Sequence, residues 1–335
     1  MSPVQMKAGV VRKSVAVIVA AGFVAVSAGC SSIPEPTSCD SAFSAGSASN
    51  LIAATGATGS APEVSFPTPV LTQSVQTSVL QEGDGQQLFA GQVADLQLSI
   101  YVGETGELLG STEYDPTNPL RLTVGADDDM IAQSVECMTV GTRAATVLTV
   151  EDLYGADQLD PSLGLDNSDT LILVTDVERG YLGRANGELQ RLERGFPAVV
   201  TAPDGAPGIT LPNEAPPTEL GITNIRTGDG EVVEEGDQVV VHYLGVLWQD
   251  ASGDGTVFDS SWDRGAPSTF EAVALSDEQE SGLVPGFAEA LIGQTVGSQV
   301  LAVIPPEFGY PEGQSPASIP EGSTTVFVFD VLGIQ

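Results

Sequence analysis

The sequence predicts an α+β fold in which a curled antiparallel β-sheet packs over a short α-helix. Residues 239–248 and 324–331 are rich in β-branched and aromatic side chains that alternate with a period of two, which is typical of strands with one buried face. Residues 285–292 begin with proline and are followed by Gly293, as short helices prefer. One short helix between antiparallel strands is the pattern of this class.

The chain begins with the features of an export signal. Three basic residues precede an apolar run at 14–27, which ends in small residues before Cys30. Because the run is too short to span a bilayer, we predict a secretory signal peptide over residues 1–29 and an extracytoplasmic location.

Residues 28–30 are Ala-Gly-Cys, which is similar to a lipobox, the motif whose cysteine is acylated and becomes the mature amino terminus. We therefore expect a lipid on Cys30 that anchors the protein to the outer face of the cell membrane. Ser27 departs from the leucine or valine usual at this place, so an ordinary cleaved signal with a spectator cysteine is the alternative. No later segment is apolar enough to cross a membrane, so the lipid would be the only membrane contact.

The chain is strongly acidic, with a formal net charge of -34. All 45 acidic residues follow Cys30, whereas three of the 11 basic residues precede it. Such a surface repels nucleic acid and anionic lipid head groups, and we expect neither as a partner. We interpret the charge as a solvated acidic exterior.

Two cysteines, Cys39 and Cys137, follow Cys30. In an oxidising compartment the simple hypothesis is a disulfide between them, which would tie the segment after the anchor to the first domain. Closing so long a loop would stabilise the fold by about 4 to 5 kcal/mol through the lost entropy of the unfolded chain. The cysteine spacing fits neither a zinc site nor a redox motif.

The sequence also contains two copies of one unit. Residues 61–67 resemble residues 206–212, and the Gly-Asp-Gly at 83–85 recurs at 228–230 with the same spacing. Ordered self-similarity of this kind indicates two related domains of ordinary size.

Composition places the boundaries of these domains. Residues 30–60 are rich in Ser, Ala, Gly, Pro and Thr, and we predict that they form a flexible, lipidated tether. The first domain then covers residues 61–180, and the second covers 218–335. Residues 181–217 form a connector together with the leading strand of the second copy.

The second copy carries a series of sequence blocks. They are V-V-V-H-Y-L-G from Val239, F-D-S-S-W-D-R-G from Phe258, L-V-P-G-F from Leu283, I-P-P-E-F-G-Y-P from Ile304, I-P from Ile319 and, near the end, T-V-F-V-F-D-V-L. Over residues 220–335 these blocks resemble the FKBP-type peptidyl-prolyl cis-trans isomerases, the macrolide-binding immunophilins. The resemblance implies a half-barrel sheet curled over one helix, as the strand and helix patterns also predict.

The chain contains a single histidine, His242, which lies within the predicted strand 239–248. Without a second histidine, Ser-His-Asp chemistry and histidine-rich metal sites are excluded, and we predict neither a metal ion nor another cofactor. A lone strand histidine is more often structural than catalytic. Prolyl isomerisation fits these limits, because an apolar cleft that disfavours the dipolar planar amide needs no strong base.

The resemblance assigns roles to residues of the second copy by motif position. A proline pocket would be lined by Tyr243, Phe258, Leu283, Val284, Phe287, Tyr310 and Phe327. Phe287, where the family most often has tryptophan, would form its floor. We assign Phe270 and Phe329 to core packing instead.

Polar groups complete the implied site. Asp259 would place a carboxylate beside the substrate carbonyl and hydrogen-bond to Tyr243, with Arg264 as its ionic partner. The Tyr310 hydroxyl and the Ile319 backbone N–H would hold substrate carbonyls. The implied catalytic residues are therefore Asp259, Tyr310, Phe258 and Phe287.

Three serines depart from the family pattern. Ser268 and Ser318 stand where bulkier apolar residues are usual, and Ser315 lies in a flap that commonly has an aromatic residue or a histidine. These serines weaken the rim of the pocket more than its floor. The affinity for a macrolide, the second ligand class that the resemblance implies, therefore stays open.

The first copy lacks most of the rings. Leu109, Ile131 and Leu173 stand where the second copy has Phe258, Phe287 and Phe327, and only Tyr101 and Tyr154 keep counterparts, namely Tyr243 and Tyr310. We interpret the first copy as a degenerate FKBP-like domain without activity.

These observations predict a lipid-anchored prolyl isomerase that assists the folding of exported proteins, with proline-containing or unfolded exported polypeptides as its partners. Two alternatives stay open. A binding module or chaperone would hold such segments without useful turnover, and a purely structural envelope lipoprotein would have no affinity for proline peptides.

Overall fold

The structure is a computed structural model, and it describes residues 39–155, 164–192, 194–248, 255–275, 282–310, 313 and 315–335. The predicted signal peptide, the predicted lipidation at Cys30 and the start of the predicted tether lie outside these residues. In the described part of the chain, no helix is long and apolar enough to cross a membrane.

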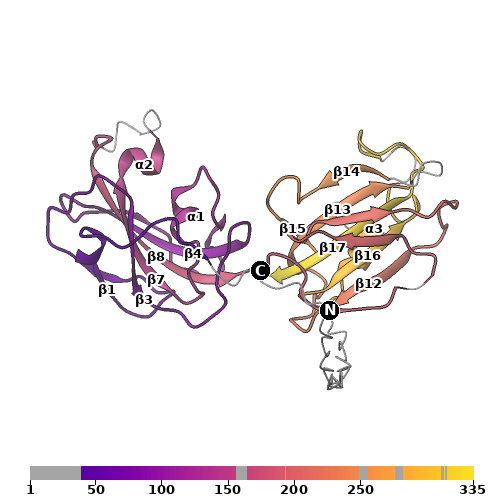
Figure 1. Cartoon of the computed structure of the whole chain (residues 1–335), viewed down its shortest axis with the longest axis horizontal. Coiled ribbons are helices and arrows are strands. Elements are labelled where there is room, and N and C mark those ends of the chain that lie inside the picture. Colours follow the sequence, from indigo (N-terminus) through magenta and orange to yellow (C-terminus); the bar gives the residue numbers. More distant parts are fainter. Residues whose placement is uncertain are drawn as a thin grey trace, which may run out of the picture. The chain divides into compact units, whose positions relative to one another are not determined.

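The second half of the chain forms a seven-stranded antiparallel sheet, which we name the second sheet (Figure 1). Its strands are β9 Glu188–Leu189, β12 Gly221–Thr227, β13 Gln238–Leu247, β14 Thr256–Ser260, β15 Ser268–Glu271, β16 Gln299–Ile304 and β17 Thr325–Ile334. They lie in the order β14-β13-β17-β16-β12-β9, and β15 pairs with the start of β13. Helix α3, Pro285–Leu291, packs on one face of this sheet. The fold class is therefore α+β, as predicted.

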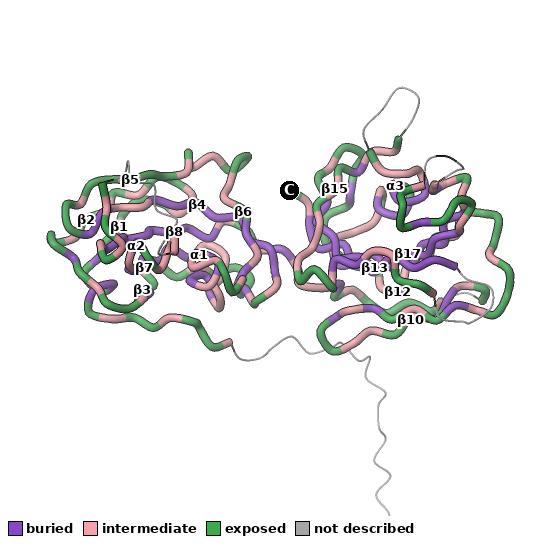
Figure 2. Tube along the Cα trace, turned by 90° about the horizontal axis from the view of Figure 1, so that it is seen from above, coloured by how far each residue is buried: buried purple, intermediate pink, exposed green. Residues whose placement is uncertain are grey.

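The core between α3 and the second sheet follows from alternation along the strands. Val239, Val241 and Tyr243 of β13 face the helix, whereas Leu244 and Val246 contribute to a second apolar cluster on the opposite face. The central strands are buried along nearly their whole length because both faces are covered (Figure 2).

The first half of the chain forms another antiparallel sheet. We name it the first sheet, because it comes first in sequence. Its strands are β3 Gln76–Gln81, β4 Val93–Val102, β5 Leu108–Ser111, β6 Leu120–Thr123, β7 Arg143–Thr149 and β8 Thr170–Gly180. Their order is β3-β7-β8-β4-β5, with β6 paired to β4, so each strand has a counterpart at the same place in the second sheet.

Two short helices belong to the first sheet. Helix α1, Met130–Ser134, begins after Asp129, whose carboxylate accepts the N–H groups of Ile131 and Ala132. Helix α2, Val150–Tyr154, begins with a capping box between Thr149 and Asp152. Such caps satisfy backbone N–H groups that the start of a helix leaves unpaired. They therefore stabilise the first turn of both helices, although each is only one turn or so long.

Each sheet carries a hairpin on the face away from its helices. The hairpins are β1 Ala53–Thr55 with β2 Glu63–Ser65, and β10 Ala198–Thr201 with β11 Pro207–Thr210. Ala54 and Val64 pack against the first sheet, and Val199 and Ile209 against the second. The predicted connector therefore contains a packed β-hairpin as well as linking segments.

The predicted tether differs from the structure at its end. Ser49–Leu51 forms the 3-10 helix η1, and Ala48 and Ile52 are buried against the first sheet. Small residues in this stretch look like a linker in composition, but they pack on strands β3 and β7. The folded part of the chain thus begins well before residue 60.

The described chain begins at a covalent link. Cys39 and Cys137 form a disulfide with their Cα atoms 5.5 Å apart and 98 residues apart in sequence. Cys137 has a φ of 70° directly after helix α1 and its following turn, which is a left-handed conformation unusual for a residue with a side chain. The disulfide ties the start of the described chain to this turn.

Candidate functional site

Six aromatic rings that contact one another gather on the helix-facing side of the second sheet. We name them the aromatic cluster, and they are Tyr243, Phe258, Phe270, Phe287, Phe327 and Phe329. Phe287 comes from helix α3 and is 6% exposed, with its ring centroid 4.4 Å from that of Phe329 and 5.3 Å from that of Phe327. Phe287 therefore lies at the base of the cluster, where the resemblance places the floor of a proline pocket.

The walls come from different strands. Phe258 of β14 is partly exposed and meets Phe327 of β17 edge to face, with centroids 5.5 Å apart. Leu283 and Val284 precede α3 and are partly buried against the same core. Because strand alternation fixes which side chains share a face, residues distant in sequence converge here.

Two members of the aromatic cluster are residues that we assigned to core packing. Phe329 is fully buried, which fits a packing role. Phe270 is only partly buried, and its ring centroid lies 5.1 Å from Phe287 and 5.7 Å from Tyr243. Phe270 therefore belongs to the wall as well. The alternation of side chains between the two faces of the short strand β15 could have indicated this.

Asp259, Tyr243 and Arg264 form a hydrogen-bonded group at the edge of the cluster. The Tyr243 hydroxyl donates to Asp259 Oδ2 over 2.6 Å, and Arg264 pairs with Asp259 Oδ1. Arg264 also donates to the Tyr243 hydroxyl over 2.8 Å and lies over its ring, 5.4 Å from the centroid. The Arg264 and Asp259 side chains are roughly half exposed, so this ion pair adds little stability and mainly fixes geometry.

These contacts set the protonation states of the group. Burial acts to raise the pKa of Asp259, but the hydrogen bonds from Tyr243 and Arg264 outweigh it and hold that pKa below its usual value. Burial, followed by the hydrogen bond to Asp259, raises the pKa of Tyr243. At neutral pH the carboxylate is therefore ionised and the phenol keeps its proton.

Tyr310 lies within electrostatic range of the same carboxylate. Burial, and then the charge of Asp259, raises the pKa of the Tyr310 hydroxyl. Among the described residues this hydroxyl has no hydrogen-bond partner. It is thus a protonated, partly buried donor for which the described part of the chain offers no competing acceptor, so it could bind a carbonyl.

Ile319 differs from what the resemblance implies. Its side chain is 3% exposed, and its backbone N–H donates to the carbonyl of Pro316 over 2.9 Å. A turn therefore occupies the amide that would hold a substrate carbonyl. Sequence could not reveal this, because the turn depends on the backbone conformation of residues 316–319.

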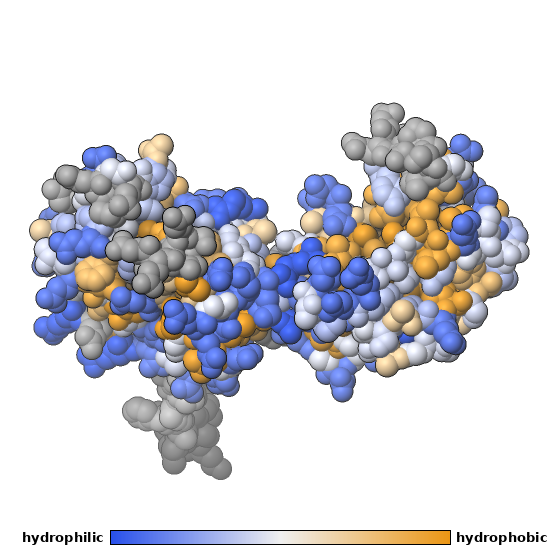
Figure 3. All heavy atoms as spheres, turned by 180° about the vertical axis from the view of Figure 1, so that it is seen from behind, coloured by the Kyte–Doolittle hydropathy of each residue, from blue (hydrophilic) through white to orange (hydrophobic). Residues whose placement is uncertain are grey.

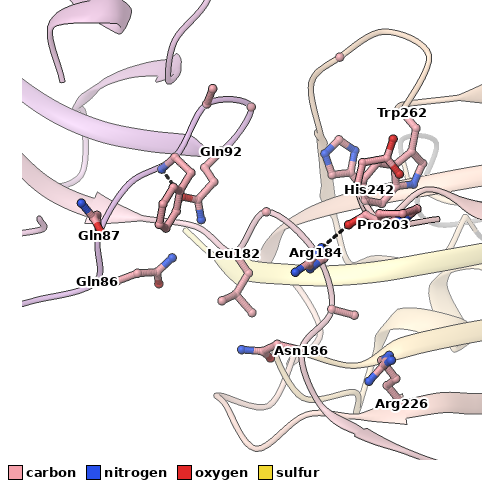
Figure 4. Close-up of a pocket in the computed structure, with 17 residues that line it drawn as sticks. Gln86, Gln87, Gln92, Leu182, Arg184, Asn186, Pro203, Arg226, His242 and Trp262 are labelled. Carbon is pink, nitrogen blue, oxygen red and sulfur yellow. Dashed lines mark hydrogen bonds between the residues drawn. The ribbon is translucent and has the colours of Figure 1, made fainter. Parts of the chain in front are cut away.

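His242 lies on the opposite face of β13 from Tyr243. Its ring stacks on that of Trp262 with centroids 4.0 Å apart (Figure 4). Its Nδ1 lies 2.8 Å from the Ser261 hydroxyl. Burial, followed by the charge of Arg264, lowers the pKa of His242 to about 4. The imidazole is therefore neutral at physiological pH, and it helps to fix the loop that carries Arg264.

The pairing register corrects one counterpart between the sheets. Gln97 pairs with Asp176 as His242 pairs with Asp330, so Leu98 rather than Tyr101 occupies the place of Tyr243. Tyr101 instead packs with Phe66 on the hairpin side of the first sheet. The same register confirms that Leu109 and Leu173 occupy the positions in the first sheet that Phe258 and Phe327 occupy in the second.

Comparison with known proteins identifies the class of the second sheet. Residues 230–332 match the family model described as FKBP-type peptidyl-prolyl cis-trans isomerase. A probable FK506-binding protein of Corynebacterium glutamicum is 39% identical over 128 residues, which are 38% of this chain and 96% of that protein. An FK506-binding protein of Streptomyces anulatus is 33% identical over 129 residues, with the same two shares.

The chain belongs to the FKBP-type peptidyl-prolyl cis-trans isomerase family. Among solved structures, FkpA from Escherichia coli aligns with 30% identity and a TM-score of 0.29, over 43% of this chain and 53% of that one. The range matched by the family model contains helix α3, strands β13 to β16 and most of β17 of the second sheet, and no strand of the first sheet.

Proposed function

We propose that the second sheet is a peptidyl-prolyl cis-trans isomerase that acts on exported proteins. The observation that carries this proposal is the aromatic cluster over α3 with the Asp259, Tyr243 and Arg264 group at its edge. Family membership gives the reaction class, and these residues supply the groups that such a reaction needs.

The chemistry follows from the amide bond. Rotation about a peptide bond has a barrier of about 18–20 kcal/mol, because the planar form is stabilised by resonance and is strongly dipolar. A proline ring held against Phe287 and Phe258 would bring its amide out of water, which disfavours the planar form more than the twisted form. Each reduction of the rotation barrier by about 1.4 kcal/mol raises the rate tenfold.

Three polar side chains would orient the substrate. The ionised carboxylate of Asp259, fixed by Tyr243, would lie beside the carbonyl that precedes proline. The hydroxyl of Tyr310 would donate a hydrogen bond to a neighbouring carbonyl. No proton transfer is required, which agrees with a neutral His242 on the other face of the strand.

Rates of cis-trans exchange test this proposal directly. We expect the mature protein to accelerate exchange of an X-Pro peptide, measured by NMR exchange spectroscopy. Phe258→Ala and the double variant Asp259→Ala with Phe287→Ala should each lose at least tenfold in rate. Leu109→Ala, at the matching place in the first sheet, is the control and should keep the full rate. An exchange rate with the wild-type protein that equals the uncatalysed rate would refute the isomerase activity.

A binding module without turnover is the second candidate. The engaged N–H of Ile319 supports it, because one expected carbonyl donor is occupied by Pro316. Titration of the same peptide separates the two proposals. Saturable chemical-shift changes without faster exchange would favour the binding module, and no shift changes would leave only a structural role. The same titration with a macrolide would test that ligand class.

We also propose that the protein is lipid-anchored at Cys30 and faces the outside of the membrane. The signal pattern and the lipobox-like Ala-Gly-Cys support this, and the disulfide between Cys39 and Cys137 suits an oxidising compartment. Cys30→Ser should release the protein from the membrane fraction. Equal membrane fractions for the wild type and the variant would refute the anchor.

The first sheet is proposed to be a degenerate copy of the isomerase domain. Its strand order and register support common descent, and aliphatic residues replace the rings of Phe258 and Phe327. A role in spacing or in holding client segments fits such a domain better than catalysis does. Exchange activity that survives Phe258→Ala in the second sheet would contradict this assignment.

A further inference from the structure

Gly245 lies in the middle of strand β13, directly beside two rings of the aromatic cluster. A Cβ atom built on Gly245 would come within 2.7 Å of Phe258 Cζ and 2.8 Å of Phe327 Cε1. Contacts this short do not occur for real side chains, so any other residue would displace at least one ring. Gly245 is not among the glycines with positive φ, so the backbone conformation does not demand glycine.

The strand register explains why both rings meet this position. Gly245 pairs with Asp259 of β14 on one side and with Phe327 of β17 on the other. Phe258 is the unpaired residue of the β-bulge between the pairs Gly245–Asp259 and Val246–Val257, so its ring can lie beside the glycine on the same face as that of Phe327. Because Gly245 has no side chain, the rings of Phe258 and Phe327 can occupy the space beside it and form the wall of the site.

The first sheet has a different residue at the same place. Ile100 pairs with Gly110 of β5 and Leu173 of β8, as Gly245 pairs with Asp259 and Phe327. A shared hydrogen bond fixes this alignment, because the N–H of Leu98 donates to Thr112 as that of Tyr243 donates to Ser261.

The side chains around Ile100 compensate for its size. Ile100 packs in one apolar cluster with Leu109 and Leu173, the counterparts of Phe258 and Phe327. A branched aliphatic side chain with two leucines in the first sheet thus corresponds to glycine with two phenylalanines in the second. Cores tolerate such exchanges when the total volume is kept.

We propose that Gly245 is the residue that positions the aromatic wall of the substrate site, and that Ile100 closes the same place in the first sheet. This inference rests on the proposed isomerase and names the position that confines proline binding to the second sheet. Gly245 does not contact substrate itself. It acts through Phe258 and Phe327, whose rings need the space above it.

The test is Gly245→Ala in the mature protein, with Gly110→Ala as the control. Gly110 is a strand glycine in the first sheet where an added Cβ would meet nothing within 4 Å. We expect Gly245→Ala to weaken binding of an X-Pro peptide at least tenfold and to shift the ring resonances of Phe258 and Phe327. The control should change neither. Peptide affinity within twofold of wild type, in a folded Gly245→Ala protein, would overturn the inference.

A second variant separates positioning from simple loss of folding. In Gly245→Ala with Phe258→Leu the smaller leucine, as at position 109, should relieve the close contact and raise the unfolding temperature above that of Gly245→Ala. Peptide binding should stay weak, because the aromatic wall is gone. Recovery of both properties, or of neither, would contradict a positioning role.

Failure of the proposed function gives a different pattern. If the wild-type protein neither binds nor isomerises any X-Pro peptide, the isomerase is refuted. The spatial part of the inference is then decided by the ring resonances alone. Unchanged Phe258 and Phe327 resonances in Gly245→Ala would overturn it.

Discussion

Two buried aspartates occupy matching positions in the two sheets but have different partners. Asp176 of β8 forms a buried ion pair with Arg143, whose guanidinium also binds the carbonyls of residues 55–57 and 60. Asp330 of β17 has Gln299 at the place of Arg143 and accepts the N–H of Ala185. One aspartate is therefore paired with a buried cation, whereas the hydrogen bonds that the described residues give the other come from amide N–H groups.

This difference gives the second sheet a pH-dependent stability. Burial raises the pKa of Asp330 to about 6, despite the hydrogen bonds from Ala185 and Gln299. Because this value exceeds the ordinary aspartate pKa of about 4, the folded state binds the proton more tightly than the unfolded state. The resulting stabilisation is fully present below pH 4 and is lost as the pH rises through 6.

Asp330→Asn should remove this dependence. Gln299 Oε1 is buried and has no hydrogen-bond partner among the described residues. Once the Gln299 amide is turned over, the amide introduced by this substitution can donate to it. We expect a smaller loss of unfolding free energy between pH 4 and 7 than in the wild type. Both tryptophans lie in residues 248–262, so tryptophan fluorescence during urea unfolding reports on the second sheet.

Asp176→Asn is the matched comparison in the first sheet. It leaves the Arg143 guanidinium buried and unpaired, and we expect a cost of about 3 to 5 kcal/mol in unfolding free energy. Circular dichroism would follow this transition, since the first sheet has no tryptophan. Equal effects of the two asparagine variants at pH 7 would contradict the distinction between the sites.

The pH profile of exchange should also be flat. Asp259 titrates below its ordinary range, His242 near pH 4, and Tyr243 and Tyr310 above theirs. We therefore expect constant kcat/KM for an X-Pro peptide from pH 5 to 8, at a temperature where the protein stays folded. An inflection near pH 6.5, the ordinary histidine value, would show that His242 takes part after all.

At the scale of elements, two central strands and the helix of the second sheet could be predicted from sequence. Residues 239–248 and 285–292 agree closely with β13 and α3, because alternation and the Pro and Gly flanks act locally. The two hairpins could not be predicted, since strands of three or four residues carry too little pattern. Tyr101 was assigned the wrong counterpart because residue type was matched instead of the two-residue period, and Leu98 lies three positions away on the other face.

The hairpin β10–β11 should stabilise the second sheet through one of its faces. Val199 packs into the apolar cluster behind the sheet, whereas the neighbouring Val200 is 70% exposed. Val199→Ser should therefore cost about 1 to 2 kcal/mol in unfolding free energy, since it loses apolar burial. Val200→Ser is the control and should stay within about 0.5 kcal/mol. Fluorescence-monitored urea unfolding measures both, and equal values would mean that the hairpin is not packed on the sheet.

At the scale of the whole molecule, charge is the dominant property. Hydrophilic residues cover much of the face drawn in Figure 3, between smaller apolar areas. Within residues 230–332 Arg264 is the only arginine or lysine, and it is paired with Asp259. A substrate of the proposed isomerase would therefore approach the aromatic cluster through a predominantly negative field.

This field should select among substrates. We expect X-Pro peptides flanked by lysine to be isomerised several-fold faster, as kcat/KM at low salt, than the same peptides flanked by glutamate. The difference should vanish at 1 M salt, where the Debye length falls to about 3 Å. An alanine-flanked peptide, the control, should show little salt dependence. Equal rates for both charged peptides at low salt would rule out such steering.

The early start of the folded chain also limits where the enzyme could work. If Cys30 carries the proposed lipid, only the segment up to Cys39 separates the membrane from the disulfide on Cys137. A fully extended chain of this length spans roughly 30 Å, at about 3.5 Å per residue. The first sheet would then stay close to the bilayer surface, and clients would be met as they emerge from the membrane rather than deep in the surrounding medium.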